Sequence, residues 1–205
     1  MEVYTTENEQ VSVLKNFFVE NGKAIAAGLI IGIGGIVGWN YYQSHQVTQL
    51  QDAAVAYEAA TVVKGTAEEQ LTRLKLFAKE ANNTYGAFAG LDLALKSVES
   101  NDLPGAEAAL TAALPKADNE ELKDLINARL ARVQLGQGNA DAALSTAGNI
   151  KGKGWAAYAQ DIRGDALLHK GDVKGAQEAY TTGIQSEGAG TIKSVMTFKL
   201  DNLAG

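Results

Sequence analysis

The sequence contains no cysteine and only two histidines. A chain without cysteine forms no disulfides, offers no thiolate nucleophile and builds no thiolate metal site. His45 and His169 stand 124 positions apart, which is not the spacing of a metal-binding pair. A G-x-S-x-G nucleophile elbow and a phosphate-binding loop are also missing. These absences predict a protein that is not an enzyme and that needs no metal or cofactor.

Positive charge is also scarce. The chain has 18 Lys and Arg against 24 Asp and Glu, a formal net charge of −6. Nucleic acids are bound through clustered Lys and Arg, and the sequence shows no such cluster. We therefore expect no nucleic-acid partner.

Charge is entirely absent from residues 24–42, which read AIAAGLIIGIGGIVGWNYY. A helix of this length spans roughly 28 Å, close to the roughly 30 Å hydrocarbon core of a bilayer. Lys23 precedes the stretch, and Trp39, Tyr41 and Tyr42 stand at its far end. Aromatic and basic side chains are typical of the membrane interface, so the stretch predicts a transmembrane helix in contact with lipid.

Two other interpretations of this stretch are a buried helix and a cleaved signal. A buried helix of a soluble protein is usually shorter and carries a polar face. A signal peptide ends in small residues of A-x-A type, whereas this run ends in bulky ones. We expect an uncleaved anchor over residues 23–43, between a short segment, 1–22, and a repeat domain, 44–205.

Orientation is indicated by the basic residues that flank the anchor. Lys15 and Lys23 lie before it, whereas the first basic residue after it is Lys64. Basic residues near the ends of a transmembrane helix favour the cytoplasmic side. This bias predicts a cytoplasmic N-terminus and a domain on the opposite side, which fits a bacterial periplasm.

Glycine is enriched within the anchor and occurs at two spacings of four residues, Gly28 to Gly32 and Gly34 to Gly38. Such spacing lets a second helix approach closely in lipid, although glycine is also common in membrane helices generally. The candidate helix-packing positions are Gly28, Gly32, Gly34, Gly35 and Gly38.

The segment before the anchor places apolar residues three and four positions apart, at Val11, Leu14, Phe17 and Phe18. This spacing indicates one helical face. The segment is either a short interfacial helix or the start of the anchor helix, and Asn21-Gly22 is the candidate break between them.

Residues after the anchor show helical periodicity and no convincing strand pattern. Capping-box spacing occurs at Thr66 with Glu69 and at Asp118 with Glu121, and Asn83, Asn139 and Asp172 are placed as N-caps. We expect helices near 46–64, 67–81, 84–99, 104–114, 119–136, 140–148, 155–170, 173–185 and 191–203.

Three stretches, 93–110, 130–144 and 163–180, align without gaps. Their turns also coincide, at Asn101-Asp102, Gly138-Asn139 and Gly171-Asp172, where Gly or Asn tolerates the left-handed backbone that ends a helix. Small residues in register let paired helices pack closely: Ala94, Ala131 and Gly164 on the first helices, and Ala106, Ala143 and Ala176 on the second.

This pattern is that of tetratricopeptide repeats. Tyr180 supplies the expected large aromatic residue in the third stretch, where the others have Leu110 and Ala147. We therefore predict an all-α chain in which a single N-terminal transmembrane helix precedes a tetratricopeptide-like solenoid. Such a stack presents an extended binding surface.

Both ends of the stack are less regular. Residues 46–81 suggest a degenerate further pair with Tyr57 and Phe77 in its core. Ile192, Val195, Met196 and Leu203 are spaced to lie on one face of a final capping helix.

Charged residues on two predicted helices form a candidate partner groove. They are Arg129 and Arg132 on one helix and Asp161, Arg163 and Asp165 on another. The alternative is a solvated helix surface. Lys151-Gly152-Lys153-Gly154-Trp155 is interpreted as a turn with Trp155 packed into the next helix, and contact of its lysines with a partner is the weaker option.

Several strings carry a resemblance to a known family: SHQV after the anchor, NNTYGAFAGLDLA, INARLARVQ and IKGKGWAAYAQDIRGDALLHKGD. Together with the acidic N-terminus and glycine-rich anchor, they resemble the YfgM-type ancillary subunits of the bacterial Sec translocon over essentially the whole chain. The resemblance implies a single-span inner-membrane protein with a periplasmic tetratricopeptide domain. Its implied partners are the SecYEG channel and the membrane-anchored periplasmic chaperone PpiD.

We therefore expect a non-enzymatic, membrane-tethered scaffold that assists the hand-over of newly exported proteins. The alternative is an envelope-stress signalling regulator that acts through the cytoplasmic tail, for which the resemblance implies a response regulator of the Rcs system as partner.

Overall fold

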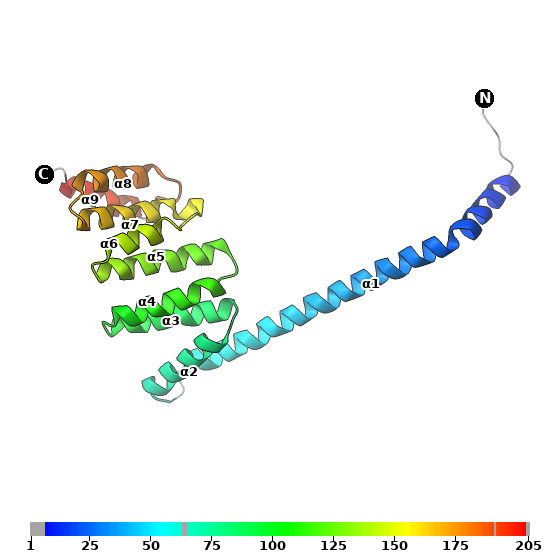
Figure 1. The fold of residues 1–205 in the computed structure, drawn as a ribbon, viewed down its shortest axis with the longest axis horizontal. Helices are drawn as coiled ribbons and strands as arrows, with labels where there is room; N and C mark the ends of the chain where they lie inside the picture. The colour runs from blue at the N-terminus through cyan, green and yellow to red at the C-terminus, as the bar shows by residue number, and fades with distance from the viewer. Residues whose placement is uncertain (1–6, 63–64, 191, 204–205) are drawn as a thin grey trace, which may run out of the picture. The chain divides into compact units, whose positions relative to one another are not determined.

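The computed structural model describes residues 7–62, 65–190 and 192–203, and these are helical with short connections (Figure 1). The chain divides into two compact units, Met1–Asp52 and Ala53–Gly205. The helices are α1 Glu7–Thr61, α2 Ala67–Glu80, α3 Thr84–Glu99, α4 Leu103–Ala113, α5 Glu120–Gly136, α6 Ala140–Ala147, α7 Ala156–His169, α8 Val173–Gln185 and α9 Ile192–Leu203, with 3-10 turns at Leu114–Lys116 and Lys153–Trp155.

The first unit consists of the N-terminal part of α1. This helix is long and apolar enough to cross a membrane, and no residue of its most apolar window is buried within the chain. The helix runs without interruption through Asn21-Gly22, where the Asn21 side-chain amide donates to the Phe17 carbonyl at 3.0 Å. The structure thus favours the second interpretation of the N-terminal segment, in which it begins the anchor helix.

The same helix also continues past residue 43, where we expected a separate helix to begin near residue 46. No glycine or proline occurs between residues 43 and 61, so nothing in the sequence removes a backbone hydrogen bond or favours a turn there. The expected second helix is therefore the C-terminal part of α1.

Most predicted caps are present in the second unit. Thr66 and Glu69 form a complete capping box at the start of α2, and Asn83, Asn139 and Asp172 each accept backbone N–H groups of the following helix. The prediction for Asp118 was wrong. Asn119 is the N-cap of α5, because its extended backbone directs the side-chain oxygen to the Leu122 N–H at 2.8 Å.

The three turns within the repeats share one backbone geometry. Asn101, Gly138 and Gly171 have positive φ angles of 58°, 79° and 81°. The next residue then donates its N–H to a carbonyl five positions earlier, over 2.8 Å for Asp102, 2.8 Å for Asn139 and 2.9 Å for Asp172. These Schellman bonds end the first helix, and the same Asp or Asn side chain caps the second.

Each helix pair shares its core with the next pair. Figure 1 shows the helices of this unit stacked in chain order. The first buried cluster joins α3, α4 and α5, the second joins α5, α6 and α7, and the third joins α7, α8 and α9. Leu110 and Ile126 are almost fully buried in the first cluster. Burying such a side chain contributes about 1.5–3 kcal/mol each, so the pairs stabilise one another.

The ends of the stack are closed differently. At the N-terminal end, the Tyr57 ring lies 6.0 Å from Phe77 and 5.8 Å from Tyr85, and its hydroxyl donates to Asp92 at 2.6 Å. Burial and this bond raise the pKa of Tyr57 above its usual value.

At the C-terminal end, α9 buries Ile192 and Met196, and Leu203 is half-buried. Val195 was wrongly assigned to the packed face, because it is 46% exposed. The spacing explains this difference, since residues 192, 196 and 203 point the same way and residue 195 is rotated by about 60–100° from them.

Candidate binding surface

Four charged side chains from three helices form an ion-pair network. Asp161 on α7 is only 1% exposed and accepts from Arg132 on α5 at 2.6 Å and from Lys199 on α9 at 2.7 Å. Lys199 also bonds Asp165 at 2.6 Å, and Arg132 lies 3.9 Å from the same carboxylate. The network connects consecutive first helices of the repeats with the terminal helix.

Tyr180 extends this network into the core. Its hydroxyl donates to Asp165 at 2.7 Å, and the Lys199 ammonium lies 5.5 Å from the ring centroid. Burial raises the pKa of Tyr180 well above its usual value, and the hydrogen bond and negative charge of Asp165 raise it further. The phenol therefore stays protonated and serves as a donor to the carboxylate.

The five residues of the predicted groove do not share one surface. Asp161 and Asp165 are four positions apart and point to the same side of α7, where they are engaged within the chain. Arg163 lies between them in sequence, so helical geometry turns it to the opposite side. Arg129 and Arg132 remain beside a pocket between α5 and α7.

That pocket, which we call the α5–α7 pocket, has a volume of about 410 Å³. Its lining combines aromatic and aliphatic side chains with two guanidinium groups, and the Trp155 and Tyr158 rings lie 5.4 Å apart. The lining residues are Leu125, Ala128, Arg129, Arg132, Gly154, Trp155 and Tyr158.

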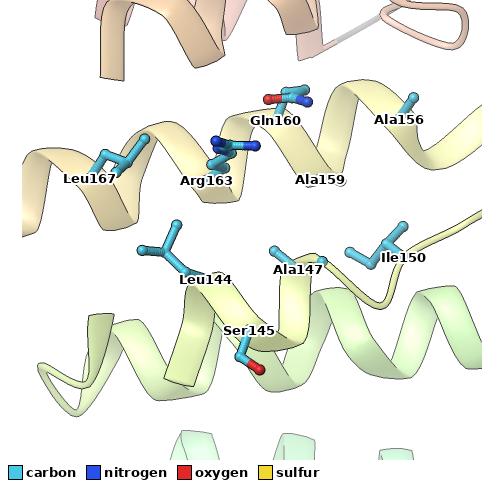
Figure 2. Close-up of a pocket in the computed structure, with 10 residues that line it drawn as sticks. Leu144, Ser145, Ala147, Ile150, Ala156, Ala159, Gln160, Arg163 and Leu167 are labelled. Carbon is cyan, nitrogen blue, oxygen red and sulfur yellow. The ribbon is translucent and has the colours of Figure 1, made fainter. Parts of the chain in front are cut away.

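A second hollow of about 600 Å³ lies between α6 and α7. Figure 2 shows Leu144, Ala147 and Ile150 directed toward α7, whereas Ser145 points away from it. Arg163 is the charged residue of this lining. Arg163 and Arg129 therefore belong to different pockets, which makes one a natural control for the other.

Sequence reasoning missed the role of Asp124. This carboxylate is 1% exposed and accepts the backbone N–H groups of Lys151 at 2.9 Å and Gly152 at 2.7 Å. Its position in the repeat register matches Ala87 and Ala157, which are fully buried. A carboxylate at a buried alanine position is a signal that could have identified the bond.

The loop at 151–155 thus has a structural function. Asp124 fixes its first two residues, a 3-10 turn follows at Lys153–Trp155, and the half-buried Trp155 packs against the second core cluster. The interpretation as a turn agrees with this geometry. The Lys151 ammonium donates to the Gly148 carbonyl at 2.6 Å.

The small residues assigned to repeat packing lie within the stack. Gly164 and the alanines at 94, 106, 131, 143 and 176 are all buried, and Tyr180 is fully buried. Gly164 lies directly against the Tyr180 ring.

The anchor positions have open surroundings in the chain alone. A Cβ atom added at Gly28, Gly32, Gly34, Gly35 or Gly38 would meet no atom within 4 Å. Lys23, Trp39, Tyr41 and Tyr42 are exposed. The Trp39 and Tyr42 rings lie 6.2 Å apart, and Tyr41 stacks on His45 at 6.5 Å. Their assignment to helix packing and to the membrane interface stays a prediction, as do the limits of the anchor.

The part of the chain that the structure describes contains no group of three or more His, Asp or Glu side chains placed to hold a metal ion. The pockets found there lie between helices of the stack, which is an arrangement suited to contact with other molecules.

Comparison with known proteins supports the repeat assignment. A family model described as a tetratricopeptide repeat-like domain matches residues 15–205. The chain is 46% identical to the ancillary SecYEG translocon subunit of Escherichia coli strain K12, with all of both chains covered. It is 34% identical to the protein of that name from Haemophilus influenzae, over 98% of this chain and 99% of the relative.

The chain belongs to the family of ancillary SecYEG translocon subunits. A third member, from Aggregatibacter actinomycetemcomitans, is also 34% identical over 98% of this chain. No solved structure matches the chain. Family membership and the structure together establish the predicted fold class, an all-helical chain with a tetratricopeptide-like domain and one apolar N-terminal helix.

Proposed function

We propose that this protein is a non-enzymatic adaptor that holds a repeat domain beside the SecYEG translocon. The observation that carries the proposal is the full-length similarity to relatives named for that translocon, at 46% identity with the Escherichia coli protein. A helical-repeat domain supports it, because solenoids of this kind present extended surfaces to protein partners.

The proposed topology is a single pass through the bacterial inner membrane, with lipid around residues 23–43 of α1, the N-terminus in the cytoplasm and the repeat domain in the periplasm. The absence of cysteine makes this testable by labelling single cysteines. We expect Glu99→Cys to react with a membrane-impermeant maleimide in intact spheroplasts, and Asn16→Cys to react only after permeabilisation. The reverse pattern would reject the orientation.

The finer part of the proposal is that a membrane-anchored periplasmic chaperone, PpiD, is a second partner and that the pair receives newly exported proteins. Tethering supports this idea physically, because anchoring two proteins in one membrane raises their effective concentration and makes weak contacts productive. The glycines of α1 and the α5–α7 pocket are candidate contact regions in the anchor and the domain.

Photocrosslinking in native membranes tests the proposal. A benzophenone amino acid would replace exposed side chains on different helices, such as Phe88 on α3, Glu178 on α8 and Phe198 on α9. We expect capture of a translocon component, and of the chaperone, from at least one position. Capture of neither from any position would reject the adaptor function.

The signalling alternative, with a response regulator of the Rcs system as partner, makes a different prediction. Deleting residues 2–20 removes the tail but leaves the repeat domain. Under the adaptor proposal, this deletion preserves crosslinking from the domain. Loss of a stress-response phenotype with unchanged crosslinking would instead favour regulation through the tail.

A further inference from the structure

The register of the three repeats places large apolar residues in one row. Phe88, Leu125 and Tyr158 each lie six positions before the small residue of their first helix. Phe88 is 36% exposed, and Leu125 and Tyr158 are half-buried. Equivalent positions on successive first helices face the same side of the stack, and we call this row of three residues the strip.

The α5–α7 pocket lies within this strip. Leu125 and Tyr158 belong to both the row and the pocket, and the Trp155 ring adds a further apolar wall. A pocket of about 410 Å³ has room for one large side chain. A strip with a pocket suits an extended peptide, whose alternate side chains point to the same side.

The charge beside the pocket is positive, and only one of its two arginines forms an ion pair within the described part of the chain. Arg129 and Arg132 lie three positions apart on α5, and no carboxylate is among the lining residues. Arg132 is held by Asp161, whereas Arg129 is exposed and has no ion pair within residues 7–62, 65–190 and 192–203. A guanidinium group next to an apolar pocket favours a carboxylate carried close to an apolar side chain.

We infer that this surface binds an extended segment of a partner protein in which an acidic residue stands next to a large apolar residue. The apolar side chain enters the α5–α7 pocket, and the carboxylate meets Arg129. The inference deepens the adaptor function. It depends on that proposed function in one respect, which is that the ligand is a protein.

Fluorescence anisotropy with labelled peptides and the full chain in detergent micelles tests this inference, with empty micelles as the blank. The probe peptide is GSDFDLDGS, and its comparisons are the neutral GSNFNLNGS and the less apolar GSDADADGS. We expect the probe to bind at least tenfold more tightly than either comparison, because it alone uses both the guanidinium and the pocket.

Variants locate the site. We expect Arg129→Gln to weaken binding of the probe about tenfold, or about 1.4 kcal/mol, and to leave the neutral peptide unchanged. Tyr158→Ala should weaken binding of both. Arg163→Gln is the matched control, because this arginine lines the separate hollow between α6 and α7 (Figure 2). It should leave all three affinities unchanged.

Three results would overturn the inference: no binding of the probe up to millimolar concentration, equal binding of acidic and neutral peptides, or an equal loss with Arg163→Gln. Crosslinking from position 125 to a second copy of the chain would also reject it. These outcomes are separable from failure of the adaptor function. If peptide selectivity is absent but crosslinking to the translocon succeeds, only the assignment of this surface is wrong.

Discussion

The ring of Tyr180 on α8 occupies the space that a side chain at Gly164 on α7 would need. A Cβ atom added to Gly164 would lie 2.6 Å from Cδ1 and 2.7 Å from Cζ of the ring. In the first repeat, the corresponding pair is Ala94 with Leu110. Compared with the first repeat, the third repeat therefore has a larger residue on its second helix and a smaller residue on its first helix.

This match predicts that Gly164→Ala destabilises the domain by about 1–3 kcal/mol, because the ring is fully buried and has little room to move. Adding Tyr180→Leu recreates the pair of the first repeat and should recover part of the loss. Urea unfolding of the full chain in micelles, followed by circular dichroism, measures both. Gly154→Ala is the control, since its Cβ would meet no atom within 4 Å. Unchanged stability of Gly164→Ala relative to the parent chain would contradict the prediction.

The repeat architecture could be predicted from the sequence because its determinants are local. Small residues, turn residues and caps recur at fixed spacing, and each acts on the backbone within a few positions. Helix ends were accordingly predicted within one or two residues for most of the domain. The sequence identified Tyr180 by its size. Its packing against Gly164 could not be predicted, because it depends on how α7 and α8 are placed together.

The turn at Gly171 gives a second prediction. Its φ of 81° lies in the left-handed region, and a Cβ there would meet no atom within 4 Å, so only backbone strain opposes a side chain. We expect Gly171→Ala to lower the free energy of unfolding by about 1 kcal/mol. Asn101→Gly at the equivalent turn should raise it by a few tenths to 1 kcal/mol. The midpoints of urea unfolding measure the effects of both substitutions. Effects of the same sign would contradict this prediction.

The ion-pair network could not be predicted because its members are distant in sequence. Asp161 and Lys199 are 38 positions apart and meet only when α9 closes the stack. Pattern alone assigned Asp161, Arg163 and Asp165 to one groove, although helical geometry separates Arg163 from the other two. Asp161 and Asp165 are paired within the domain, whereas Arg129 is exposed beside the α5–α7 pocket.

Lys199 is expected to hold α9 against α7. Replacing it in Lys199→Met leaves the buried Asp161 with Arg132 as its remaining charged partner and should cost about 1–3 kcal/mol. Hydrogen exchange followed by mass spectrometry should show faster exchange in residues 192–203 and no change in α3 and α4. Lys193→Met is the control on the same helix. Equal exchange in the two variants would show that the ion pair does not secure α9.

Tyr180 predicts a loss of stability at high pH. Its pKa is raised in the folded chain by burial and by Asp165, whereas an unfolded tyrosine titrates near 10.0. The folded state therefore holds the phenol proton more tightly, and this contribution is complete below pH 10 and declines as the pH rises above it. The slope for one such group reaches about 1.4 kcal/mol per pH unit.

Urea midpoints between pH 9 and pH 11.5 should fall less steeply in Tyr180→Phe than in the parent chain. Equal slopes in the two proteins would exclude Tyr180 as the responsible group.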